Sequence, residues 1–169
     1  SSAWWAIQLW PTETGDKVGA DPHWLLTPQE GQPLSFDGTG FADGRYLLRV
    51  TANDETDNYP GQGLQAQIET EEFVIDNTPP DVAVLAARVD GGKLMISFKA
   101  ADALTALQYA EFSVNGGEWI SARPTTGITD SLAHEYAVET AKPAGAEFTV
   151  AVKVADENDN VTVRKVTVH

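Results

Sequence analysis

Apolar and polar residues alternate along most segments of this chain, a period of two that predicts β-strands with one face toward a core. In the first such segment Trp5, Ile7 and Leu9 share one face. The other face carries four residues, two of them also tryptophans: Trp4, Ala6, Gln8 and Trp10. The segment 102–109 allows either a short helix or a bulged strand edge. The alternation predicts an all-β protein.

A strand-and-turn pattern occurs twice in the chain. Residues 46–58 and 148–160 each join an alternating apolar strand to the turn Asp-Glu-x-Asp-Asn, and the second copy begins 102 positions after the first (148 minus 46). Internal repetition of this kind indicates two related units. The chain is therefore expected to form two antiparallel β-sandwich modules in tandem.

The segment Asp76-Asn-Thr-Pro-Pro80 predicts the boundary between the modules, because two adjacent prolines fix φ and cannot donate to a strand ladder. This places the modules at 1–78 and 79–169. Three strands are expected in the first module, over residues 4–10, 46–52 and 65–75. A short apolar run begins at Trp24.

The second module has a more regular pattern. Seven short strands are expected, separated by turn-forming residues: 82–87, 94–98, 107–114, 118–120, 132–139, 147–155 and 161–168. The turns Asp90-Gly-Gly92 and Asn115-Gly-Gly117 have the composition of tight hairpin turns. Seven strands at this spacing are typical of a β-sandwich.

Several motifs resemble known modules. The run from Gly44 to Asn53, the Gly61-Gln-Gly63 turn and the strand that ends in Phe73 resemble the sixth and seventh strands of a fibronectin type III module. The second half resembles a bacterial Ig-like module through four motifs: Asp76-Asn-Thr-Pro-Pro80, Ala101-Asp102, Phe112-Ser-Val-Asn-Gly-Gly-Glu-Trp119 and Val154-Ala-Asp156. The pair is similar to C-terminal tails of large secreted bacterial proteins, often behind a β-propeller. The resemblance implies an exported protein, extracellular or periplasmic.

A complete fibronectin-type module has two strands before the one that begins here near Trp4. The first module is therefore expected to lack its N-terminal strands, which a protein partner or an upstream part of the same polypeptide would supply. An open edge rich in tryptophan favours strand pairing. The candidate partner-binding residues are Trp4, Trp5, Trp10 and Trp24. Together with Tyr59 they also suggest a platform for carbohydrate, although alternation predicts that at least one tryptophan belongs to the core.

The duplicated acidic turns raise calcium as a second possibility. Their sequence is similar to the cadherin linker motif, and calcium prefers carboxylate and amide oxygens. The candidate ligands are Asp54, Asp57, Asp156 and Asp159, to which Asp76 or Asp102 could add oxygens. The alternative is a strand-connecting turn, because Asp and Asn bond their own backbone. The sequence favours the turn, since the proline of the cadherin motif is absent and the second copy precedes the last strand.

Charge and composition exclude several functions. With 25 acidic and 11 basic side chains, a formal charge of −14 disfavours nucleic acid and anionic membranes as partners. Without cysteine there is neither a disulfide nor thiolate chemistry, and no apolar run is long enough for membrane insertion. His23, His134 and His169 are scattered, and no catalytic motif is present. We expect a non-catalytic structural or docking module without a cofactor. The alternative is a carbohydrate-binding or calcium-dependent adhesion module.

Overall fold

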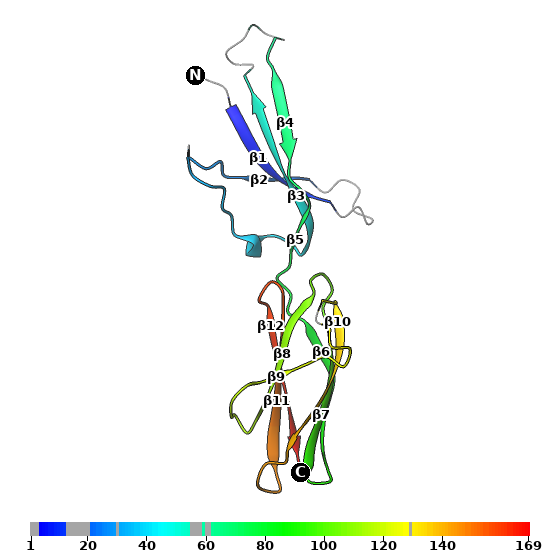
Figure 1. Ribbon diagram of the computed structural model, residues 1–169. Helices are drawn as coiled ribbons and strands as arrows, with labels where there is room; N and C mark the ends of the chain where they lie inside the picture. Colours follow the sequence, from blue (N-terminus) through cyan, green and yellow to red (C-terminus); the bar gives the residue numbers. More distant parts are fainter. Residues whose placement is uncertain (1–3, 13–20, 30, 55–58, 60–61, 129) are drawn as a thin grey trace. The chain divides into compact units, whose positions relative to one another are not determined.

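A computed structural model describes residues 4–12, 21–29, 31–54, 59, 62–128 and 130–169. The described residues form antiparallel strands and a single 3-10 turn, so the prediction of an all-β protein is confirmed. The chain divides into two compact units, Ser1–Asp76 and Asn77–His169 (Figure 1). The division lies two residues before the boundary that the prolines suggest.

The described strands of the first unit form one sheet. They are β1 (Trp4–Pro11), β2 (His23–Leu25), β3 (Gly44–Asn53), β4 (Gln65–Glu69) and β5 (Phe73–Ile75). Their order is β2-β1-β3-β4, and β5 pairs with the first residues of β3. The single strand expected over 65–75 is thus two strands. Thr70 lies between them and makes two hydrogen bonds to Leu48, both of 3.0 Å. Its hydroxyl oxygen accepts the backbone N–H of Leu48, and its own backbone N–H donates to the Leu48 carbonyl.

The core of the first unit lies at one end of this sheet. Leu9, Tyr46 and Ile75 form its buried apolar cluster, and Ile7 is buried as well. The segment 26–43, which includes the 3-10 turn η1 (Gly38–Gly40), supplies Phe36 and Phe41 against them, with the two rings edge to face at 5.8 Å. Among the described residues this segment, and not a second sheet, is what covers the apolar face (Figure 1).

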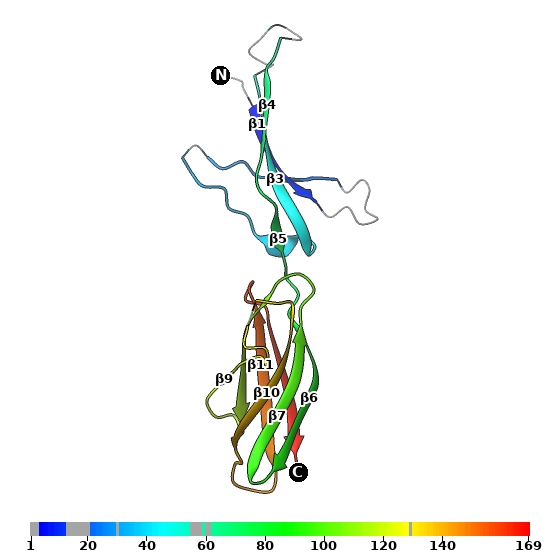
Figure 2. The same ribbon diagram turned by 45° about the vertical axis from the view of Figure 1, so that its right-hand side comes forward.

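The second unit is a two-layer sandwich (Figure 2). Its described strands are β6 (Asp81–Asp90), β7 (Lys93–Ala101), β8 (Leu107–Val114), β9 (Ile120–Ala122), β10 (Ala133–Ala141), β11 (Phe148–Asp156) and β12 (Val161–Val168). One sheet has the order β10-β7-β6 and the other β12-β11-β8-β9. Each of these seven strands overlaps one of the seven expected from the sequence. The helix considered over 102–109 does not form: Asp102 caps a turn there, and the pairing of β8 with β11 shifts at Ala155 and Asp156, as a bulged edge requires.

Both sheets contribute to the core of the second unit. Alternate residues point inward, so that Ile96 and Phe98 of β7 face Val150 and Val152 of β11 in one buried cluster. The rings of Phe98 and Tyr136 stack with their centroids 4.5 Å apart, and burial raises the pKa of the Tyr136 hydroxyl.

Val84 breaks the regularity of β6. Its φ is 53°, and the pairing with β7 shifts between Ala83 and Ala86, so the strand bulges there. A left-handed backbone is costly for a β-branched residue, and the Val84 side chain is 69% exposed, which means that little packing offsets the cost.

We therefore expect Val84→Gly to raise the free energy of unfolding by about 1 kcal/mol in urea denaturation. Val163→Gly is the matched control, because Val163 lies on β12, is 44% exposed and has no positive φ. That control should lower stability by about 1 kcal/mol. Equal losses in the two variants would contradict the bulge.

Candidate functional site

The sheet of the first unit has two different faces, set by its register. Trp5 pairs with Ala52, Ile7 with Val50 and Leu9 with Leu48, and these residues point to the side of the core. Intervening residues point to the opposite side. Each face must therefore be considered separately as a binding surface.

The apolar face is covered at one end and open at the other. Leu9 is fully buried, whereas Trp5 is 43% exposed and Ile68 is 69% exposed. The cross-strand row Trp5–Ala52–Ala66 floors a hollow of about 610 Å³ at the open end. Its lining is mostly apolar: Trp5, Ala52, Asn53, Asp54, Leu64, Gln65 and Ala66. Exposed apolar residues gathered on one face are a common feature of protein interaction sites.

The edges of the sheet are also open. β2 pairs with β1 at Ile7, Gln8 and Leu9 alone, so the β2 side of β1 has no partner strand at Trp4–Ala6 among the described residues. On the other edge, β4 pairs with β3 and all five of its residues are exposed. Unpaired backbone at a sheet edge is a template for an added strand.

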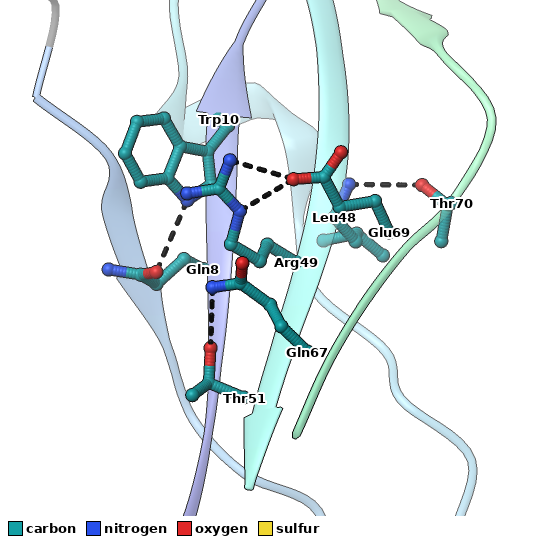
Figure 3. Close-up of polar contacts among 8 residues, drawn as sticks. All are labelled: Gln8, Trp10, Leu48, Arg49, Thr51, Gln67, Glu69 and Thr70. Atoms are coloured by element: carbon teal, nitrogen blue, oxygen red, sulfur yellow. Dashed lines mark hydrogen bonds and ion pairs between the residues drawn. The ribbon is translucent and has the colours of Figure 1, made fainter. Parts of the chain in front are cut away.

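The opposite face is polar and aromatic (Figure 3). The guanidinium of Arg49 lies over the Trp10 ring, 4.0 Å from its centroid, and contacts the Glu69 carboxylate at 2.7 Å. The Trp10 indole N–H donates to Gln8 at 3.2 Å. Trp24 pairs with Gln8 and is 68% exposed, so it belongs to the same face. Aromatic, amide and charged groups are thus aligned across four strands.

The first unit carries most of the negative charge. Residues 1–76 hold 13 acidic and 3 basic side chains, a formal charge of −10 out of −14. Arg45 contacts Glu72 at 3.1 Å, and Arg49 contacts Glu69. The hydrogen bond from the Thr12 hydroxyl and the neighbouring Arg45 guanidinium hold the pKa of Glu72 below its usual value. Both described arginines of the unit are therefore paired with carboxylates.

The four candidate tryptophans do not form one surface. Trp5 lines the apolar hollow, whereas Trp10 and Trp24 lie on the polar face, and the side chain of Trp4 is outside the described part of the structure. Trp5 lies on the core face but is 43% exposed. The expectation that at least one tryptophan belongs to the core stays a prediction, because the Trp4 side chain lies outside the described part of the structure. Leu64, Ala66 and Ile68 were missed, although their alternation with Gln65 and Gln67 was a visible signal.

The acidic turns use their first aspartate to hold the backbone. Asp156 is fully buried, and its carboxylate accepts the backbone N–H groups of Asn158 and Asn160 at 2.8 and 2.9 Å and the Asn160 side-chain amide at 2.9 Å. In the first copy, the Asp54 carboxylate accepts the N–H of Leu64 at 2.6 Å. Asp57 lies outside the described residues, and Asp159 is exposed with a φ of 63°.

The structure brings Asp156 close to Asp102, one of the two residues that the sequence suggested could add oxygens, and not close to Asp159. Within the second unit, carboxylate oxygens of Asp102 and Asp156 lie within 4.8 Å of each other. These two carboxylates could contribute ligands to calcium, which takes six to eight oxygens. However, the Asp156 oxygens accept turn bonds, and one Asp102 oxygen accepts the N–H groups of Leu104 and Thr105. Calcium therefore stays a hypothesis.

Comparison of the chain with family models, curated proteins and solved structures gave no match. Within the described residues, no helix has the length and apolar character needed to cross a bilayer.

Proposed function

We propose that this protein is a non-catalytic docking module of a larger exported assembly. The observation that carries the proposal is the open end of the apolar face in the first unit. Trp5, Leu64 and Ile68 stand exposed beside a hollow floored by Ala52 and Ala66. A polypeptide segment that covered them would remove apolar surface from water, at about 25 cal/mol per Å².

The contrast between the two units supports this proposal. In the second unit, two sheets enclose a core of 14 buried apolar residues. In the first unit a loop segment packs against the cluster of Leu9, Tyr46 and Ile75, Ile7 is also buried, and the sheet continues beyond that cover. A β-sheet with one apolar face is stable when another layer lies on it. A docked partner would provide the missing part of that layer.

The proposed likeness to fibronectin type III modules has one further support. The Tyr46 hydroxyl donates to the carbonyl of Ala42, four residues upstream, at 2.7 Å. This is the contact of a tyrosine corner, which occurs in Ig-type sandwiches. Export to the periplasm or the cell exterior is part of the proposal through that likeness.

The surroundings of the histidines favour a non-catalytic role. His23 packs against Phe41 with ring centroids 5.1 Å apart, and His169 lies 3.1 Å from the Glu147 carboxylate at an exposed site. His134 is buried, and its Nε2 has no hydrogen-bond partner. His23 lies on β2, His134 on β10 and His169 after the end of β12, so the three imidazoles are spread over separate parts of the described structure.

Docking predicts that one exposed apolar side chain controls binding. We expect a displayed peptide library to yield binders of the wild-type chain whose affinity falls at least ~10-fold in Ile68→Lys, because a charge would sit in the apolar contact. Folding should be kept, since Ile68 is 69% exposed. Gln67→Lys is the control on the opposite face of the same strand. If no binder is sensitive to Ile68→Lys, the proposed function is wrong.

The polar face favours a second candidate, carbohydrate binding. Trp24 is exposed beside Gln8, and aromatic faces pack against the C–H groups of sugar rings while amides bond to hydroxyls. A polysaccharide panel tests it directly. Binding should be lost in Trp24→Ala and kept in Trp5→Ala, because these two rings lie on opposite faces. No retention on any polysaccharide would remove this candidate.

A further inference from the structure

The hollow in the first unit has the shape of a receptor for one large apolar side chain. Ala52 and Ala66 are directly paired on neighbouring strands, and their small side chains leave the floor low. Trp5 follows in the same row, and Leu64 is 75% exposed at the other border. Large side chains beside small ones make a depression into which a facing layer interdigitates.

The backbone around the hollow fits an extended partner better than a helical one. Neither the β2 side of β1 at Trp4–Ala6 nor the outer edge of β4 has a partner strand in the described part of the unit. An extended segment can bond to such an edge while its alternate side chains reach the apolar face. A helix would leave these N–H and C=O groups unpaired.

Charge decides which segment fits. The first unit has a formal charge of −10, and Asp54 lies at the border of the hollow. Arg45 and Arg49 already contact Glu72 and Glu69. A field of this sign repels nucleic acid, anionic lipid and a second copy of the same chain, and it attracts lysine and arginine.

From these three observations we infer that the hollow binds an extended, basic segment of a partner protein. A large apolar side chain of that segment lies over Ala52 and Ala66, and the lysine or arginine residues that alternate with it face the acidic surroundings. The inference rests on the proposed docking function and adds the chemistry of the partner.

The test uses the full chain and two synthetic peptides of roughly ten residues, the upper end of the usual range of strand lengths. In one, leucine and valine alternate with lysine. In the other, glutamate replaces each lysine. Fluorescence anisotropy should show at least ~10-fold tighter binding of the lysine peptide, and a fall of about tenfold when salt rises from about 0.05 M to about 0.5 M.

A filled hollow is the matched structural control. Ala66→Leu places a large side chain where the partner residue would lie, and we expect it to weaken lysine-peptide binding at least ~10-fold. Gln67→Leu adds the same side chain on the opposite face of β4 and should leave binding unchanged. The Ala66 site is exposed, so both variants should fold, which circular dichroism checks.

Four results would overturn the inference. Equal binding of the two peptides would exclude a charge preference. Equal binding of the lysine peptide to Ala66→Leu and to the wild-type chain would exclude the hollow as the binding site. If the wild-type chain sediments as a dimer and Ala66→Leu makes it a monomer, the occupant of the hollow is a second copy of the chain. If neither peptide binds, the partner of the hollow is not a basic segment. In this last case the proposed function still stands if the peptide library yields binders sensitive to Ile68→Lys.

Discussion

Replacing Asp156 with alanine is expected to lower the free energy of unfolding by about 3 kcal/mol. The carboxylate is fully buried and accepts three hydrogen bonds from Asn158 and Asn160. Each donor left without a partner costs about 1–3 kcal/mol, and relief of repulsion from the nearby Asp102 carboxylate offsets part of the total. Chemical denaturation in EDTA measures the loss.

The control for this prediction is Asp159→Asn in the same turn. Asp159 is exposed, its φ of 63° suits asparagine as well as aspartate, and its side chain lies outside the carboxylate cluster. We expect a change within about 0.5 kcal/mol. A loss as large as that of Asp156→Ala would mean that the turn depends on both acidic groups.

The same variants separate the turn role from the calcium hypothesis. If Asp156 acts through the turn alone, its replacement costs the same free energy in EDTA and in calcium. If calcium binds the cluster, the wild-type chain becomes more stable as calcium is added, by RT ln(1 + [Ca²⁺]/Kd). Asp102→Asn should then abolish that gain, because it removes one of the two neighbouring carboxylates.

Local pattern predicted the strands of this protein well, because alternation and turn chemistry depend on neighbours in sequence. In β11, Val150, Val152 and Val154 are buried as their spacing indicates. Gly91 and Gly92 have φ of 56° and 78°, the positive values that a tight two-residue hairpin turn requires. These features need no knowledge of distant contacts.

The site could be predicted less well, because it depends on which residues of the sheet are covered by segments distant in sequence. Alternation assigned Trp5 to the face of Leu9 but could not show that the covering segment reaches one and not the other. Thr70 interrupts the expected strand through its bonds to Leu48, a contact across 22 positions. The proximity of Asp102 and Asp156 likewise results from the fold, because these residues are far apart in sequence.

Leu9→Ala is expected to unfold the first unit selectively. Leu9 is fully buried, and it forms the main buried apolar cluster of that unit with Tyr46 and Ile75. A buried leucine replaced by alanine costs about 2–5 kcal/mol, a large share of what so small a core supplies. The second unit has its own core, with residues such as Phe98 and Val152, and should stay folded.

Two-dimensional NMR of the whole chain distinguishes these outcomes residue by residue. In Leu9→Ala the amide signals of β1 and β3 should lose their dispersion, while those of β7 and β11 keep theirs. Leu64→Ala is the matched control, since Leu64 is 75% exposed and its truncation should cost less than about 0.5 kcal/mol. Loss of dispersion in β7 and β11 as well would contradict separate cores. An unchanged spectrum would mean that burial of Leu9 does not hold the sheet together, and the docking surface on that sheet would then need another source of rigidity.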